Sequence, residues 1–321
     1  MSKFKEVFLI SRKKKEKWTK DNIPDLKDKI IIITGANSGL GFEITKVLSK
    51  KNPTIVMACR NLEKAEKAKK DILNENPSAQ LDIMQIDLSK LTSVRSFAKS
   101  FTEKYEKLDI LFNNAGVMFA PKVITEDGLE LHMAANHFGH FALTGLLMSH
   151  LEKTVNSRVI SISSMGHRFG RINFQNLNYE SGRYNKTMAY SNSKIANLYF
   201  GYELDRKLKE KGSKVLSIVA HPGWTRTNLQ TAGGELDNSK GQIRFWNFMN
   251  NFFSQTVDMG ILPQLRAAFD SEAKGGEYFS PEKFFHLRGY PIIKPSNKRS
   301  RNEKIAKRFW EVSEELTGVS Y

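Results

Sequence analysis

Residues 29–41 read KIIIITGANSGLG, and the helical pattern FEITKVL follows at residues 42–48. Four consecutive isoleucines predict a strand that is buried on both faces, as in a parallel sheet. Gly35 would make the turn into the helix, Gly39 would let a diphosphate approach backbone N–H groups, and Gly41 would let helix and sheet pack closely. A pyrophosphate would then lie on the helix N-terminus. The stretch predicts a dinucleotide site, although its G-x-x-x-G-x-G spacing differs from the common G-x-G-x-x-G.

Apolar runs recur along the chain, with helical patterns between them. They occupy residues 30–33, 54–58, 81–86, 108–112, 158–162 and 215–220, followed by a short last strand at 276–279. This alternation implies parallel strands joined by right-handed crossovers. No Pro/Ser/Gly-rich linker divides the 321 residues. We therefore expect one doubly wound α/β domain over residues 23–321, with a mostly parallel seven-stranded sheet and helices on both faces, after a basic extension at 1–22.

The chain is strongly basic, with a formal net charge of +16 and a pI near 9.7. Lysine and arginine crowd residues 3–20, beside the apolar residues of 4–10, and gather again at 294–308. Two interpretations stay open: a solvated lysine-rich surface, or weak association of the N-terminal segment with an anionic membrane surface. No recognised reader motif accompanies the charge, so we expect no nucleic-acid partner.

Cysteine content and hydropathy predict a cytoplasmic protein. One cysteine, Cys59, cannot form an internal disulfide, which indicates a reducing compartment. No apolar stretch approaches the ~20 residues that a membrane span needs. The N-terminus also lacks the apolar region of a secretory signal. Any membrane contact is therefore expected to be peripheral.

Tyr190 and Lys194 stand four residues apart in the segment YSNSK, on one face if the segment is helical. A free tyrosine has a pKa of about 10. A cation about 4 Å away favours the phenolate, by at most ~4 kcal/mol at an effective dielectric near 20. Such a tyrosine could exchange a proton with a carbonyl oxygen near neutral pH. By itself, the pair is more often a solvated helix face.

Four further motifs occur along the chain. They are NNAG at 113–116, NHFGHF at 136–141, ISS at 162–164 and HPGW at 221–224. Together with the glycine stretch and the Tyr/Lys pair, they make roughly residues 19 to 320 resemble the short-chain dehydrogenase/reductase family. The resemblance is closest to the branch of retinol dehydrogenases, related bacterial oxidoreductases and protochlorophyllide reductases. It implies a Rossmann fold with a C-terminal substrate-loop extension, a nicotinamide cofactor, and a homodimer or homotetramer.

The cofactor type depends on the end of the second predicted strand. An acidic residue there binds the ribose hydroxyls of NAD, whereas an arginine accommodates the 2′-phosphate of NADP. Arg60 stands at this position and Lys64 follows one turn on, so we predict NADP(H). The alternative is an ordinary surface arginine opening the helix at 62–73.

The resemblance extends the cofactor site to the glycine stretch and to later motifs. The implied contacts are Gly35, Asn37, Ser38, Gly39, Leu40, Gly41, Asp87, Leu88, Asn114, Ala115, Gly116, Tyr190, Lys194, Pro222, Gly223 and Thr225. Asp87 would bind the adenine amino group, and it could also act as N-cap of the helix at 90–101. No metal site is expected.

The resemblance also implies the catalytic roles. Tyr190 would give a proton to the carbonyl oxygen during reduction, and Lys194 would lower its pKa and bind the nicotinamide ribose. Ser164 would hold the same oxygen, and Asn136 would fix a water that links Lys194 to solvent. Because side chains alternate along a strand, only one of Ser163 and Ser164 can face the cofactor, and Ser164 matches the family position. His167 and His221 are expected to be structural or solvent-facing.

The substrate pocket is expected outside the carboxyl ends of the strands. Its variable wall would carry an apolar stripe made of Ile243, Phe245, Trp246, Phe248, Met249, Phe252 and Phe253. That stripe predicts either core packing or a lid over a hydrophobic ligand. The expected function is NADP(H)-dependent interconversion of a hydrophobic aldehyde or ketone and its alcohol. The alternative is an NADP(H)-binding scaffold or membrane-surface protein without catalysis, which the complete set of four catalytic-type residues disfavours.

Overall fold

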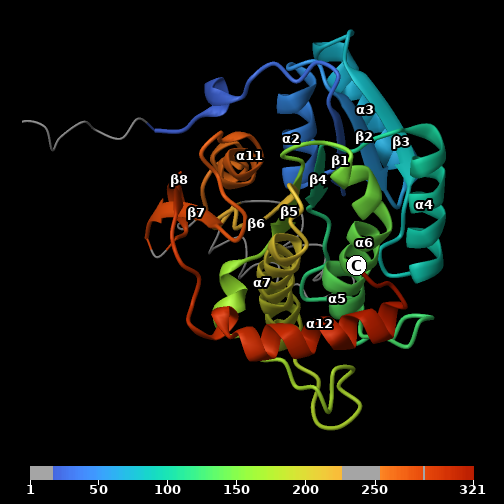
Figure 1. Ribbon diagram of the computed structural model, residues 1–321, viewed down its shortest axis with the longest axis vertical. Coiled ribbons are helices and arrows are strands. Elements are labelled where there is room, and N and C mark those ends of the chain that lie inside the picture. Colours follow the sequence, from blue (N-terminus) through green and yellow to red (C-terminus); the bar gives the residue numbers. More distant parts are fainter. Residues whose placement is uncertain (1–16, 226–253, 285) are drawn as a thin grey trace, which may run out of the picture.

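The computed structural model describes residues 17–225, 254–284 and 286–321, and its strands form one sheet (Figure 1). The strands are β1 (Ile30–Thr34), β2 (Thr54–Cys59), β3 (Gln80–Gln85), β4 (Ile110–Asn113), β5 (Arg158–Ile162), β6 (Leu216–Ala220), β7 (Tyr278–Lys283) and β8 (Arg288–Ile293). Their order is β3-β2-β1-β4-β5-β6-β7-β8. Neighbours from β3 to β7 run parallel, and β8 pairs antiparallel with β7.

Helices cover both faces of this sheet (Figure 1). They are α2 (Gly39–Ser49), α3 (Leu62–Glu75), α4 (Leu91–Lys104), α5 (Leu131–Met133), α6 (Gly139–Glu152), α7 (Lys186–Glu210), α10 (Val257–Gly260), α11 (Leu262–Phe269) and α12 (Glu303–Thr317). Helices α2, α3 and α11 pack on one face, and α4, α6 and α7 pack on the other. Helix α12 lies outside α7 and α6. None of the described helices is long and apolar enough to cross a membrane.

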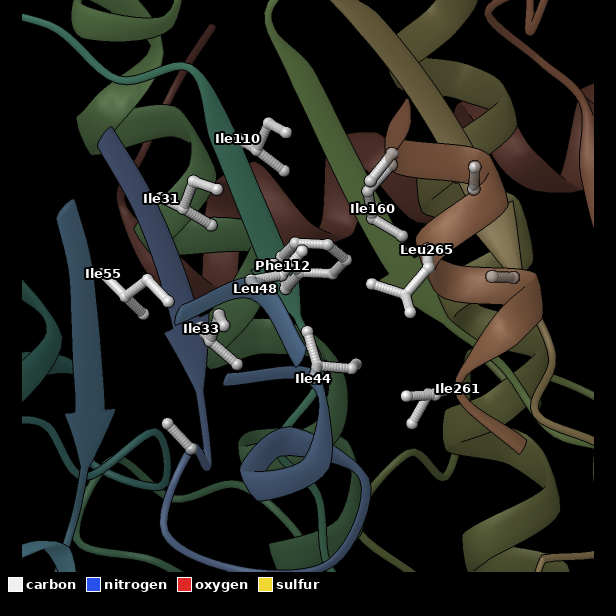
Figure 2. Packing of buried hydrophobic residues seen from close by; sticks show 14 of the residues in the cluster. Ile31, Ile33, Ile44, Leu48, Ile55, Ile110, Phe112, Ile160, Ile261 and Leu265 are labelled. Carbon is white, nitrogen blue, oxygen red and sulfur yellow. The ribbon is translucent and has the colours of Figure 1, made fainter. Parts of the chain in front are cut away.

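The isoleucine run of β1 is buried on both faces, as its sequence predicts. Ile31 and Ile33 point into the cluster beneath α2 and α11, where Ile44 and Leu265 meet them (Figure 2). Ile32 points to the opposite cluster, under α4 and α6. Each such side chain contributes about 1.5–3 kcal/mol by burial. The alternation fixes β1 in the centre of the sheet and holds the glycine turn that follows it.

The α/β fold class is confirmed, and the sheet has one strand more than the seven predicted. Strand β8 was missed because its sequence, RGYPII, contains a glycine and a proline. Proline is tolerated on an edge strand, where its missing N–H costs no ladder hydrogen bond. The basic residues 1–16 and the apolar stripe of 243–253 lie outside the described residues.

The strand order reverses between β1 and β4, and this reversal positions the candidate site. The chain winds outward from β1 to β3, then returns to β4 on the other side of β1. In open α/β sheets a crevice forms at this point, outside the carboxyl ends of the strands. The glycine turn after β1 and the NNAG loop after β4 both open into it.

Buried histidines at the start of α6 and in the turn before it make acid unfolding a direct test of the packing. Burial lowers the pKa of His137 to about 3 and of His140 to about 4. The unfolded chain therefore binds more protons than the folded one between about pH 6.5 and 4, and stability falls as pH falls through that window. Each histidine contributes up to about 1.4 kcal/mol per pH unit.

We expect urea unfolding to give a clearly lower free energy of unfolding at pH 5.5 than at pH 7.5. The variant His137→Asn should show a shallower dependence on pH. Equal free energies of unfolding at the two pH values would contradict the burial of these neutral rings.

Candidate active site

The glycine turn between β1 and α2 forms a cradle that side chains would fill. Gly35 and Gly39 have φ values of +69° and +55°, in the region that favours glycine. A Cβ on Gly41 would lie 2.3 Å from the Gly35 carbonyl oxygen and 2.6 Å from Asn114 Nδ2. Ser38 precedes α2 without a capping hydrogen bond from its side chain. The first N–H groups of α2 are therefore arranged as in an anion site, and the turn fits a diphosphate.

Thr34, which the sequence did not single out, joins this turn to the NNAG loop. Its hydroxyl oxygen accepts from the N–H groups of Asn114 and Ala115, both at 2.9 Å. The Asn114 side chain donates to the Thr34 carbonyl at 2.8 Å, and His140 Nε2 lies 2.9 Å from the Thr34 hydroxyl. A buried threonine at the end of a strand gives little sequence signal, because threonine is common in strands.

Arg60 and Lys64, the predicted 2′-phosphate contacts, lie close to the carboxyl end of β2. Arg60 directly follows β2, and Lys64 is in the first turn of α3. Both residues are exposed. Asn61 caps α3 by accepting from the Lys64 N–H at 2.8 Å, which fixes the start of the helix. The two cations thus stand beside the crevice.

Asp87 makes a turn rather than the predicted helix cap. Its carboxylate accepts from the Ser89 N–H and hydroxyl, at 3.0 and 2.6 Å. The N-cap of α4 is Lys90, three residues later, because α4 begins only at Leu91. Leu88 is buried, and its carbonyl oxygen would lie 2.2 Å from a Cβ on Gly139, so α6 packs directly on this loop.

Asn136 lies in a π-helical turn, Ala134–Phe138, between α5 and α6. Such turns are frequent at functional sites. Asn136 Oδ1 accepts from the Val117 N–H at 2.7 Å, and Nδ2 donates to the Val117 carbonyl at 2.9 Å and to Ser193 Oγ at 2.8 Å. Asn136 therefore links the loop after β4 to helix α7 by hydrogen bonds.

The two serines after β5 have different environments. Ser163 is buried and donates to the Lys194 carbonyl at 2.8 Å, so it anchors α7. Ser164 is half-buried, and its side chain hydrogen-bonds that of Tyr190. This agrees with the choice of Ser164 over Ser163.

Tyr190 and Lys194 share a buried face of α7 rather than a solvated one, with only 7% and 4% of their surface exposed. Lys194 Nζ lies 5.7 Å from the centre of the Tyr190 ring and donates to the Ile162 carbonyl at 3.2 Å. Burial raises the pKa of Tyr190 to about 12, against the hydrogen bond with Ser164, and lowers the pKa of Lys194 to about 8. The sequence-based expectation that Lys194 lowers the Tyr190 pKa is not met here, because burial of the phenol dominates. The phenol is protonated at neutral pH, as a proton donor must be.

Gly116 leaves open space between Asn136 and Lys194. A Cβ there would lie 2.8 Å from Asn136 Oδ1 and 3.5 Å from Lys194 Nζ. Any larger residue would therefore intrude between the amide and the ammonium. Gly35, Gly41 and Gly116 thus let the turn after β1, the start of α2 and the loop after β4 pack closely on their neighbours.

Pro222, Gly223 and Thr225 form a fixed turn after β6. Thr225 Oγ1 donates to the Pro222 carbonyl at 2.9 Å, and Gln255 Nε2 donates to the same oxygen at 2.8 Å. Gly223 has φ +74°, and a Cβ there would lie 2.4 Å from the Leu287 carbonyl. The turn between β7 and β8 therefore supports this part of the crevice.

A buried polar group behind Tyr190 escaped the sequence analysis. The Tyr190 ring meets Phe119 and His132 edge-on, with ring centres 5.4 and 6.5 Å apart. His132 Nδ1 lies 2.7 Å from Glu130 Oε1, and the Tyr184 hydroxyl donates to the same oxygen at 2.9 Å. Burial alone would raise the pKa of Glu130, but His132 and the backbone N–H groups of His132 and Met133 lower it. No local motif marks such a group, because its members come together only in the fold.

Comparison with known proteins decides the family. The family described as short chain dehydrogenase matches residues 29–236. The chain belongs to the short-chain dehydrogenase family. It is therefore related to oxidoreductases that bind a nicotinamide cofactor, and the resemblance seen in the sequence is confirmed.

Curated relatives of this short-chain dehydrogenase are retinol dehydrogenases. Retinol dehydrogenase 11 of Homo sapiens is 38% identical over 296 residues, which cover 92% of this chain and 87% of the relative. Retinol dehydrogenase 13 of Homo sapiens is 36% identical over 298 residues, covering 91% and 85%.

Solved structures agree with the fold. An uncharacterized protein of Mycobacterium paratuberculosis has a TM-score of 0.79 and 34% identity, covering 95% of this chain and 99% of its own. A short chain dehydrogenase of Shigella flexneri 2a, complexed with NADP, has a TM-score of 0.59 and 23% identity, covering 79% and 97%. This short-chain dehydrogenase thus shares its architecture with relatives of low identity.

Proposed function

We propose that this protein is an NADP(H)-dependent reductase that converts a hydrophobic aldehyde or ketone into its alcohol. The observation that carries the proposal is the buried Tyr190, hydrogen-bonded to Ser164 and one helical turn from Lys194. These groups lie at the carboxyl end of β5, beside the crevice into which the turn after β1 and the loop after β4 open.

Each residue has a role that its surroundings support. Tyr190 donates a proton to the developing oxyanion, and Ser164 holds that oxygen by a hydrogen bond already in place. Lys194, with its pKa lowered to about 8, can return a proton to Tyr190 near neutral pH. Asn136 positions α7 through Ser193 and keeps Lys194 beside Gly116.

The residues of the crevice fit a dinucleotide. The glycine turn would hold the diphosphate, and the loops after β4 and β6 would flank the nicotinamide. The nicotinamide ring would supply the hydride. The preference for NADP(H) rests on Arg60 and Lys64, the two exposed cations at the end of β2. Asp87 and Leu88 would contact the adenine.

A hydrophobic carbonyl compound is the proposed substrate class. The curated relatives are retinol dehydrogenases, whose name gives a long apolar alcohol as their substrate.

The proposed function is tested by the loss of NADPH absorbance with retinal, medium-chain aldehydes, steroid ketones and quinones. NADH is measured in parallel. Turnover with NADPH on at least one apolar carbonyl compound is expected. Tight NADPH binding without turnover on any member of the panel would favour a cofactor-binding scaffold instead.

Arg60→Asp is expected to reverse the cofactor preference. The guanidinium would pair with the 2′-phosphate, and a carboxylate at the same position would repel that phosphate and accept from ribose hydroxyls. We expect kcat/KM with NADPH to fall at least about tenfold, corresponding to about 1.4 kcal/mol, while that with NADH holds or rises. Steady-state kinetics with both cofactors measure the change.

Arg171→Asp is the matched control, because this exposed arginine lies in the loop before α7, away from β2. This variant should leave unchanged the ratio of kcat/KM with NADPH to kcat/KM with NADH. If Arg60→Asp weakened both cofactors equally, Arg60 would not be the residue that recognises the phosphate.

A further inference from the structure

A cavity lies against the turn Met165–Arg168, which follows Ser164. Its volume is about 110 Å³, and its lining includes His167, Arg168, His221, Tyr278, His286 and Asn297. The space suffices for a small organic ion, since one water needs only roughly 10–15 Å³ of such volume. Among the described residues that line it, none is a member of the proposed catalytic set.

Two buried imidazoles of this cavity have a ring nitrogen without a partner. His167 is 3% exposed and His221 is 2% exposed, and no hydrogen-bond partner meets Nε2 of either ring. His167 Nδ1 lies 2.5 Å from the Ser164 carbonyl oxygen, so Nδ1 carries the proton and Nε2 keeps its lone pair. His221 Nδ1 instead accepts from the Gly223 N–H at 3.3 Å, so the proton of this ring is on Nε2. Buried polar atoms are rarely left unpaired, so these two nitrogens point to a ligand.

The charge around the cavity favours an anion. Arg168 is exposed, lines the cavity, and acts on all three imidazoles, whose pKa values it lowers further than burial alone does. Lys294 acts on His286 in the same sense. Among the described lining residues, no aspartate or glutamate balances these cations.

A bound metal ion is a poor match for the same ring nitrogens. Within the described part of the chain, no group of three or more histidine, cysteine or acidic side chains has the arrangement of a metal site. The cation of Arg168 would also repel a metal. The cavity therefore requires a ligand that brings negative charge and a proton to be shared with the rings.

We propose that this cavity binds a small carboxylate, which is taken up together with a proton on His167 and accepts a hydrogen bond from His221. On protonation, His167 Nε2 becomes an N–H donor toward the carboxylate, while its Nδ1–H keeps its bond to the Ser164 carbonyl. The Nε2–H of neutral His221 is the second donor. Arg168 supplies the permanent charge at the rim. A single arginine matches a monoanion better than a phosphate dianion.

Such a ligand would connect two loops of the proposed active site. His167 holds the Ser164 carbonyl, and His221 directly precedes the Pro222–Gly223 turn. A carboxylate between them would stabilise both loops in the folded state. Thermal stability therefore reports binding without any need for turnover, so a failure here is distinct from a failure of the proposed reductase activity.

The test is thermal unfolding of the full chain in sodium acetate and in sodium chloride at equal ionic strength, at pH 7.5, 6.5 and 5.8. Acetate is expected to raise the midpoint by about 2–4 °C over chloride, as for a ligand well above its Kd. Because the bound state holds one more proton, on His167, the difference should grow as pH falls. His286, Tyr278, Arg168 and Lys294 are the other titratable or charged groups facing these rings, and comparison at one pH cancels their common contribution.

Two variants distinguish this cavity from general ion effects. Arg168→Gln should reduce the acetate effect at least threefold, whereas Arg171→Gln, an exposed arginine outside the lining, should leave it unchanged. Long-range ¹H–¹⁵N spectra of histidine-labelled protein should show one Nε2 signal, that of His167, becoming protonated on acetate addition. Equal midpoints in acetate and chloride, or an equal acetate effect in both arginine variants, would overturn the proposal.

Discussion

Tyr190→Phe is expected to lower kcat about 10²–10⁴-fold while leaving NADPH binding nearly intact, the range that a positioned general acid typically contributes. The variant removes one oxygen atom from a side chain that is 7% exposed, so the ring keeps its contacts with Phe119 and His132. Loss of rate would then report lost proton transfer rather than lost packing.

The direction of the Tyr190 pKa shift makes this effect specific to chemistry. Burial raises that pKa to about 12, so the side chain is a protonated phenol over the physiological range. In the variant, Ser164 remains as a hydrogen-bond donor to the oxyanion, but it has no neighbour that restores its proton. Lys194 still fills its place beside Gly116, so the cofactor site should be retained.

Single-turnover kinetics with NADPH and quenching of protein fluorescence by NADPH separate the two effects. Tyr199→Phe is the matched control, because it removes a hydroxyl from the same helix at a site where that hydroxyl donates to the Arg299 carbonyl. It should retain activity. Unchanged turnover in Tyr190→Phe would remove Tyr190 from the proposed role, and loss of NADPH binding would indicate a structural one.

The residues whose roles could be predicted from the sequence are those that depend on neighbours close to them in the chain. The run of isoleucines in β1 predicts burial on both faces of the strand. The role of the glycines that follow can be predicted from the strand-to-helix turn alone. The choice of Ser164 over Ser163 needs only strand alternation, and the structure gives the two hydroxyls different partners.

Long-range groups escaped prediction for a physical reason. Glu130 and Tyr184 are 54 positions apart, and His167 meets His221 and His286 only because β6, β7 and the turn after Ser164 converge. The pKa of Tyr190 likewise depends on total burial, which sequence spacing to Lys194 does not reveal. The charge of Lys194 alone predicted a lowered pKa for Tyr190, whereas burial of the phenol raises that pKa.

Gly41→Ala is expected to abolish tight NADPH binding and to destabilise the fold by about 1–3 kcal/mol, the usual cost of overpacking. In an open helix position the same change would stabilise by about 0.8–1 kcal/mol, because alanine is the better helix former. Here the added Cβ would lie 2.3 Å from the Gly35 carbonyl oxygen and 2.6 Å from Asn114 Nδ2. Neither atom can yield alone, since Gly35 forms the turn and Asn114 is held by its bond to Thr34.

To relieve that overlap, α2 must move away from the NNAG loop. This movement would displace the backbone N–H groups that are proposed to bind the diphosphate. Urea unfolding measures the loss of stability, and NADPH titration measures the loss of binding. Gly212→Ala is the control, because its φ of +67° makes alanine unfavourable there while nothing lies within 4 Å of the added carbon. That variant should lose about 1–2 kcal/mol from the backbone conformation alone and keep its NADPH affinity. If Gly41→Ala also kept its NADPH affinity, close contact between α2 and the loop after β4 would not be required for the cofactor site.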